Sequence, residues 1–208
     1  MRLLEPVRCQ VDVGGGKLGG GSGRYRKRLS DLSGVYEDAR TFETLLRESG
    51  DPCVYAVEDL RPSADAGDMI FGVTRMIPGT VGDEYFVTRG HIHATANRPE
   101  IYYGESGRGL MLLESPEGET RVIEIAPRVV CYVPPYWIHR SVNIGDDDLV
   151  MTFAYPADAG QDYDIIARSG GMRQRIVRDG RDGWKAIANP RYRMRTADEV
   201  ARVLATAR

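Results

Sequence analysis

The sequence predicts an all-β protein built around an antiparallel sandwich or barrel. Short apolar or alternating runs recur between about residues 54 and 155, and turn-forming residues separate them. The runs are VYAV, IFGVTRM, EYFVT, EIYYG, GLMLLE, TRVIEI, RVVCYV, RSVNI and LVMTFAY, and the turns are PGTVG, NRP, ESGRG, SPEG, APR, PP and GDDD. Strands that begin about every 8–12 residues, with Gly and Pro between them, are typical of such folds.

The segment before these strands predicts an arm followed by one helix. Residues 1–30 are rich in Gly and Arg and lead through GRYRKRLSDL, which indicates an irregular or edge-strand arm. Residues 38–49 carry Phe42, Leu45 and Leu46 at the spacing of an amphipathic helix, and Gly50 supplies a stop. We therefore expect the arm and the helix to occupy residues 1–50.

The C-terminal segment predicts an extension that closes with a second helix. PADAGQDYD, which follows Tyr155, is polar and rich in turn residues. Thr196 and Glu199 form a capping-box pattern, and one helical face follows with Val200, Val203 and Leu204. Since no internal repeat or long linker is present, we expect one domain over 1–208, with a barrel core at about 54–155 and a C-terminal extension at 156–208.

Composition limits the partners and surroundings of the protein. The formal net charge is −2, so no basic field favours nucleic acid. No apolar run approaches the roughly 20 residues that span a bilayer, and the N-terminus lacks the apolar core of a signal peptide. Cys9, Cys53 and Cys131 are odd in number and widely spaced, which fits reduced thiols. We expect a cytoplasmic protein that binds neither nucleic acid nor membrane.

The chain has three histidines, and all of them fall into one constellation with a carboxylate. His91 and His93 are two residues apart, so in a strand their side chains leave the same face. Glu100 and His139 open two further strand runs. Ligands from neighbouring antiparallel strands can converge in the mouth of a small barrel, where a rigid wall fixes them.

Three imidazoles and one carboxylate suit Fe(II), Mn(II), Ni(II), Co(II) or Zn(II), and the absence of nearby cysteine argues against structural zinc. An octahedral ion with four protein ligands keeps two adjacent positions for a substrate that chelates through two oxygens. That arrangement is open and catalytic.

The spacing of these residues resembles the two sequence motifs of the cupins. The matching positions are Gly90, His91, His93, Glu100 and Gly107 for the first motif, and His139 and Asn143 for the second. The gap before Glu100 is longer than usual, and the glycine that usually follows proline in the second motif is missing from PPYWIH. The resemblance implies a cupin jelly-roll-like barrel.

Longer strings resemble the cupin-type glucose-6-phosphate isomerases of archaea and some bacteria. The likeness covers roughly Arg28 to Asp162 and includes TRGHIHATANRPEIYYGESGRG, VPPYWIHRSVNIG and FAYPADAGQDY. It implies that a homodimer interconverts glucose 6-phosphate and fructose 6-phosphate, a step of glycolysis and gluconeogenesis. It also implies one divalent metal ion per subunit, Fe(II) ahead of Mn, Ni, Co or Zn, on His91, His93, Glu100 and His139.

The same resemblance implies roles for further residues. Glu100 becomes the candidate base, and Tyr102, on the same strand face, would position the substrate or assist proton transfer, unless it is simply a core aromatic. The phosphate-binding candidates are Tyr55, Thr74, Thr88, Gly90 and Tyr155. Gln161 stands where the family commonly has histidine at the phosphate end. Because glutamine donates a hydrogen bond but carries no charge, weaker phosphate binding or a shifted sugar preference follows.

Two other functions use the same residues. An Fe(II) cupin dioxygenase would consume oxygen, and a non-enzymatic cupin would bind a phosphosugar without turning it over. Thr88-x-Gly90 and YPADAG favour the isomerase over the dioxygenase, and the retained Glu100 and Tyr102 favour an enzyme over a binding protein.

Overall fold

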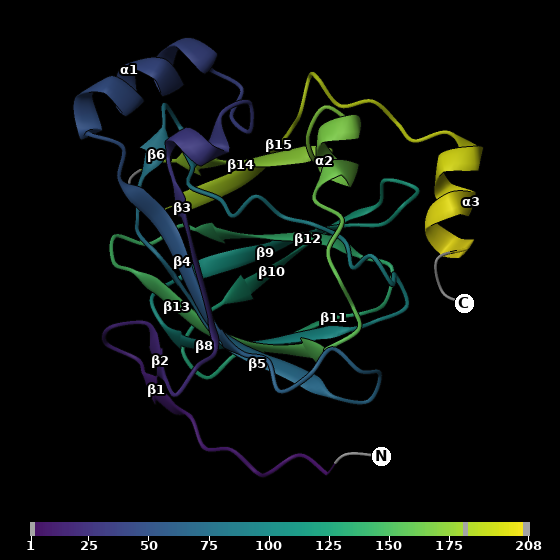
Figure 1. Ribbon diagram of the computed structural model, residues 1–208. Coiled ribbons are helices and arrows are strands. Elements are labelled where there is room, and N and C mark those ends of the chain that lie inside the picture. Colours follow the sequence, from purple (N-terminus) through teal and green to yellow (C-terminus); the bar gives the residue numbers. More distant parts are fainter. Residues whose placement is uncertain (1–2, 181–182, 206–208) are drawn as a thin grey trace.

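The largest sheet has six antiparallel strands in the order β11-β8-β13-β5-β4-β3 (Figure 1). The computed structural model describes residues 3–180 and 183–205. The strands of this sheet are β3 (Gly23–Arg28), β4 (Cys53–Leu60), β5 (Met69–Met76), β8 (Glu100–Ser106), β11 (Val130–Val133) and β13 (Leu149–Pro156).

Smaller sheets close the barrel on the other side. One has the order β10-β9-β12, with β9 (Gly109–Glu114), β10 (Thr120–Ile125) and β12 (Ile138–Asn143). A second has the order β15-β14-β7-β6, with β6 (Thr80–Val81), β7 (Glu84–Tyr85), β14 (Gln174–Asp179) and β15 (Gly183–Ala188). β1 (Gln10–Asp12) and β2 (Lys17–Gly19) form a separate hairpin. The predicted all-β class and jelly-roll-like barrel are confirmed.

Side-chain alternation fixes what faces the barrel interior. In β11, Cys131 and Val133 are buried while Val130 and Tyr132 are exposed. At the start of β8 the usual arrangement of apolar residues inside and charged residues outside is reversed, because Glu100 is buried and Ile101 is exposed. A buried carboxylate in a strand position that would suit an apolar residue indicates a functional requirement rather than a packing one.

The two predicted helices form close to their expected positions. The Asp38 carboxylate accepts a hydrogen bond from Thr41 N at 2.9 Å at the start of α1 (Ala39–Ser49), and Gly50 follows with φ 69°. At α3 (Ala197–Ala205) the capping box forms, since Thr196 N donates to Glu199 Oε2 at 2.8 Å and Glu199 N donates to Thr196 Oγ1 at 3.3 Å. The remaining helices are short: η1 (Ser30–Leu32) and α2 (Asp164–Arg168). Among the described residues, no helix has the length and apolar character to cross a membrane.

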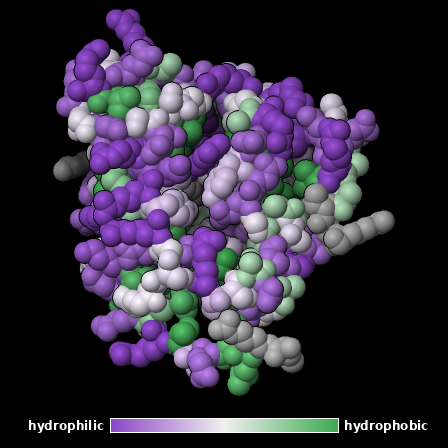
Figure 2. Space-filling model, viewed as in Figure 1, coloured by the Kyte–Doolittle hydropathy of each residue, from purple (hydrophilic) through white to green (hydrophobic). Residues whose placement is uncertain are grey.

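The C-terminal extension contains more sheet than its composition predicts. QRIVRD and GWKAIA pair as the hairpin β14–β15, and Val177 of β14 pairs with Glu84 of β7. Conversely, the run EYFVT forms a strand only over β7, at Glu84–Tyr85. The arm also joins the barrel, because β3 pairs with β4 along its length. The face shown in Figure 2 is largely hydrophilic, with hydrophobic residues reaching it in separate small groups.

Candidate metal centre and active site

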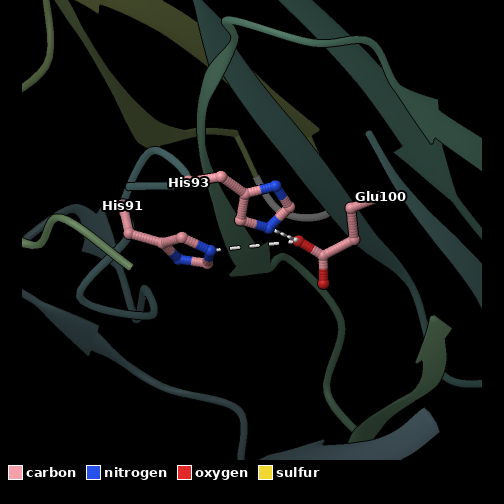
Figure 3. Close-up of side chains that lie close together, drawn as sticks. All are labelled: His91, His93 and Glu100. Carbon is pink, nitrogen blue, oxygen red and sulfur yellow. Dashed lines mark ion pairs between the residues drawn. The ribbon is translucent and has the colours of Figure 1, made fainter. Parts of the chain in front are cut away.

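His91, His93, Glu100 and His139 converge inside the barrel. Their Nε2 atoms lie 3.0 Å (His139), 3.2 Å (His93) and 3.9 Å (His91) from one oxygen, Oε2 of Glu100. Figure 3 shows the imidazoles of His91 and His93 directed at the Glu100 carboxylate. Each of the four residues is at most 9% exposed. One potential ligand atom from each of His91, His93 and Glu100 lies within 4.8 Å of the others, so these three can hold a metal ion.

The outer ring nitrogens orient two of the imidazoles. His93 Nδ1 lies 2.7 Å from the carbonyl oxygen of Arg98, and His139 Nδ1 lies 3.1 Å from that of Trp137. A carbonyl can only accept, so each Nδ1 carries the proton and each neutral Nε2 directs a lone pair at the carboxylate. The Nε2 atoms of His91 and His93 are buried without a hydrogen-bond partner. Lone pairs that face a carboxylate oxygen fit a bound divalent cation, which both kinds of ligand would coordinate.

The burial of the site sets its charges. Burial would raise the pKa of the Glu100 carboxyl, but the close contacts with His139 and His93 outweigh it and lower that pKa below its ordinary value. Burial, and then the neighbouring His139, lowers the pKa of His91 well below its ordinary value. An ionised carboxylate and a neutral imidazole are the states in which these groups bind a metal.

Backbone pairing holds two ligands against each other. His91 N donates to the His139 carbonyl at 3.0 Å, and His139 N donates back to the His91 carbonyl at 2.9 Å. The two rings lie 4.4 Å apart between centroids. Gly90 makes this approach feasible, because its φ is +73° and a Cβ there would lie 2.9 Å from the His139 carbonyl oxygen and 2.8 Å from Ile166 Cδ1.

We expect Gly90→Ala to destabilise the protein much more than Gly50→Ala. Both glycines have positive φ, but a Cβ at Gly50 meets nothing within 4 Å. The control therefore carries the backbone strain alone, about 1–2 kcal/mol. Gly90→Ala adds a clash with backbone and core, so its total cost should reach roughly 3 kcal/mol or more. Urea denaturation measures both, and equal losses would mean that the clash relaxes without cost.

Two buried tyrosines border the metal ligands. The Tyr102 ring lies 6.0 Å from that of His139, and the Tyr155 ring lies 5.3 Å from that of His93. Burial, and next the Glu100 carboxylate, raises the pKa of Tyr102 well above its ordinary value. Burial also raises the pKa of Tyr155 to about 12. Both hydroxyls therefore stay protonated at neutral pH and can donate hydrogen bonds.

The other predicted substrate residues form a second group. Tyr55 Oη accepts a hydrogen bond from Arg89 N at 3.3 Å, and Thr88 Oγ1 accepts one from Ser141 N at 3.0 Å. Thr74 is buried in β5 and pairs with Val57, two residues along β4 from Tyr55. The structure thus brings Tyr55, Thr88 and Gly90 together around the segment that precedes His91, with Thr74 on the neighbouring wall.

Gln161 is linked to the surroundings of His91 through Tyr163. Its Oε1 accepts a hydrogen bond from the Tyr163 hydroxyl. The Tyr163 ring lies 5.6 Å from that of His91, and the Arg89 guanidinium lies 5.2 Å from the centre of the same ring. Neither Tyr163 nor Arg89 stands out in the sequence, although both belong to the strings QDYD and TRGHIH that flank predicted site residues.

Tyr25 is a further aromatic that the sequence does not reveal. It stands in the Arg-rich arm, yet β3 pairs with β4 and places its ring 6.5 Å from that of Tyr55, edge to face. Its position depends on strand register, which the basic composition of GRYRKR hides.

The missing glycine of the second cupin motif has a structural counterpart. Tyr136 occupies that position in PPYWIH and has φ +72°. Its backbone N donates to the Ala96 carbonyl at 2.6 Å, which helps to hold the turn that leads to His139. The left-handed conformation is therefore retained although the glycine is not.

The family model and the relatives of similar sequence agree on one family. The family model described as glucose-6-phosphate isomerase (GPI) matches residues 26–193. The chain is 58% identical to the glucose-6-phosphate isomerase of Sinorhizobium medicae, over 96% of this chain and 94% of that protein. It is 42% identical to the glucose-6-phosphate isomerase of Thermococcus kodakarensis, over 93% of this chain and all of that protein (100%). Among solved structures, an oxalate oxidase in complex with glycolate aligns with a TM-score of 0.45 and 15% identity, over 53% of this chain and 55% of that chain.

Proposed function

The chain belongs to the glucose-6-phosphate isomerase family, and from that premise we propose how its barrel interconverts glucose 6-phosphate and fructose 6-phosphate. The proposal places the reaction at His91, His93, Glu100 and His139, with one divalent metal ion, Fe(II) first, bound by these four side chains. The observation that carries it is the convergence of three imidazole Nε2 atoms on a single buried carboxylate oxygen.

The reaction moves a hydrogen between C1 and C2 of the sugar. A bound divalent ion would polarise the carbonyl and stabilise the negative charge that develops on the two oxygens. The three histidines and Glu100 would hold the ion inside the barrel, between the sheets that contain β8 and β12. The four side chains are buried, so a sugar bound beside them would be shielded from water, which would strengthen these interactions.

Glu100 is the candidate base for transfer of a proton between the two carbons. Its lowered pKa makes it a weak base while His139 and His93 hold it, so we expect it to leave them when it accepts the proton. Tyr102 lies on the same strand face, and its protonated hydroxyl can donate to a sugar oxygen. A hydride shift between C1 and C2 is the alternative, and solvent deuterium that appears at C2 during turnover would support the proton route instead.

The phosphate would lie at the far end of the cavity from Glu100. Tyr55, Thr74, Thr88, Gly90 and Tyr155 are its proposed partners. The Thr88 and Tyr55 hydroxyls each accept one backbone hydrogen bond and keep a proton to donate. These donors flank the segment that carries His91, so the phosphate would fix the sugar relative to the metal.

A coupled assay for fructose 6-phosphate conversion tests this function. The protein would be stripped with a chelator and reloaded with Fe(II) or Mn(II), and turnover should appear only in the loaded samples. Tight binding of the phosphosugar without turnover would identify a binding protein. Oxygen uptake by the Fe(II) form would identify a dioxygenase. Full turnover by the stripped protein would refute the metal requirement.

We expect Gln161→His to lower KM for the sugar phosphate. A histidine there can carry positive charge near neutral pH and attract the phosphate dianion, which glutamine cannot do. Steady-state kinetics measure the effect, with Gln174→His, on β14, as the control. An unchanged or raised KM in Gln161→His would remove position 161 from phosphate binding.

We also propose a homodimer that uses the outer face of β8 and β11. Ile101, Val130 and Tyr132 are 45%, 59% and 51% exposed, and Tyr132 pairs with Ile101 across the two strands. β11 is the edge of its sheet, and exposed apolar edges favour pairing. Light scattering should give twice the 23.1 kDa mass of the chain. Tyr132→Glu should give the monomer and the equally exposed Met194→Glu should not, whereas a dimer in both variants would place the interface elsewhere.

The cellular setting follows from the reaction. Glucose 6-phosphate isomerisation belongs to glycolysis and gluconeogenesis, which operate in the cytoplasm. The thiols of Cys9, Cys53 and Cys131 are free, in keeping with a reducing compartment.

A further inference from the structure

A cavity lies beside β12, the strand that carries His139. Its volume is about 520 Å³, and Arg89, Arg140, Arg191, Tyr163, Ser33 and Gly34 are among the residues that line it. Arg140 follows His139 in β12, and successive strand residues point to opposite faces. His139 therefore faces the barrel interior while Arg140 faces this cavity.

The Arg140 guanidinium is buried, and among the described residues the carboxylates that favour its charge, Glu84 and Glu114, form no ion pair with it. Arg140 is only 7% exposed. Its Nη2 donates to the Arg89 carbonyl at 2.7 Å, and its Nε is buried with no hydrogen-bond partner. Within residues 3–180 and 183–205, no carboxylate forms an ion pair with Arg140. Burial of a charge without a partner is costly, so the remaining donors call for an anion that the described chain does not supply.

The rest of the lining strengthens the positive charge. Arg191 keeps an ion pair with Glu37 at 2.8 Å, and Arg89 reaches the exposed Asp164 at 3.4 Å. Asp31 is the one carboxylate among the described lining residues, and it accepts a hydrogen bond from the Arg28 backbone. Three guanidinium groups thus face one carboxylate around the cavity. Gly34 leaves the space open, because a Cβ there would meet nothing within 4 Å.

We propose that this cavity binds a phosphate-type oxyanion, either inorganic phosphate or a small phosphate monoester, at a site separate from the substrate. Guanidinium groups bind phosphate through paired hydrogen bonds, and a cavity of this size holds a small ligand. The proposed partners of the substrate's own phosphate, among them Tyr55, Thr74 and Thr88, are not among the residues that line this cavity.

Calorimetric titration with inorganic phosphate tests the proposal, with glycerol 3-phosphate in a parallel titration to distinguish the two sources. Ser33→Glu places a carboxylate on the exposed rim of the cavity, and Arg140→Gln removes the buried charge. Each should weaken the binding of the preferred ligand at least tenfold, while KM for fructose 6-phosphate stays within twofold. Ser49→Glu, on the exposed face of α1 and outside the lining, should change neither.

Two results would overturn the proposal. One is unchanged phosphate affinity in Ser33→Glu, which tests the site even where Arg140→Gln fails to fold. The other is a rise in KM that parallels the loss of phosphate affinity, because the cavity would then be part of the substrate site. Phosphate binding is measured without turnover, so the result is independent of the proposed isomerase activity.

Discussion

Glu100→Gln should reduce kcat/KM for fructose 6-phosphate by about 10³-fold or more. The substitution keeps the size of the side chain and removes its charge, so it deletes both a metal ligand and the candidate base. General acid–base catalysis alone contributes roughly 10²–10⁴-fold. The buried Glu100 oxygen also lies within 3.2 Å of two imidazole nitrogens, and an amide cannot replace its charge there. A coupled assay at saturating metal measures the loss.

The control for this experiment is Glu124→Gln. This variant carries the same chemical change at an exposed position of β10, so the activity of the variant should equal that of the unmodified protein. Metal content must be determined for each sample, because it separates the two roles of Glu100. More than a tenth of normal turnover at full metal occupancy would exclude Glu100 as the base.

His139→Ala should lower metal affinity more than 100-fold and abolish turnover. Loss of a residue that merely orients a ligand typically costs about 10–100-fold, so the loss of a ligand itself should exceed that range. Added metal should also no longer raise the thermal stability of this variant. An ion at 1,000 times its Kd stabilises a protein by about 4 kcal/mol, and His139→Ala should forfeit most of this gain. Mn(II) titration and thermal melts with and without metal provide the two measurements.

Ser141→Ala is the matched control for His139→Ala. Ser141 lies two residues along β12, on the same inward face and equally buried, but offers no ligand that metals of this class prefer. Its variant should bind Mn(II) with unchanged affinity. If His139→Ala also binds Mn(II) within tenfold of the unmodified protein, the metal is held by His91, His93 and Glu100 alone.

Much of the fold is predictable because its signals are local. Alternation within a strand, the helix stop at Gly50 and the capping box at Thr196 depend on neighbouring residues, and all three are confirmed. The histidine constellation is recognisable for a different reason, because the chain has no histidine outside it. The proximity of those histidines is likewise observed, while their metal-binding role stays a prediction.

What the sequence hides depends on pairing between distant segments. The hairpin β14–β15 is rich in charged residues, so its sequence resembles that of an irregular polar segment. Its first strand joins a sheet through pairing with β7, which is distant in the sequence. Tyr25 and Tyr163 reach the site only through the register of β3 and the turn after β13. Arg140 looks like an ordinary surface cation beside His139, and only the tertiary fold turns it into a buried charge.

The reciprocal hydrogen bonds between His91 and His139 also determine when the metal can act during folding. The two residues are distant in the chain, so their pairing closes a long loop and belongs to the slow, high-contact-order part of assembly. A complete ligand set therefore exists only after the barrel has closed. A metal that binds this set would therefore stabilise the closed barrel and not the unfolded chain.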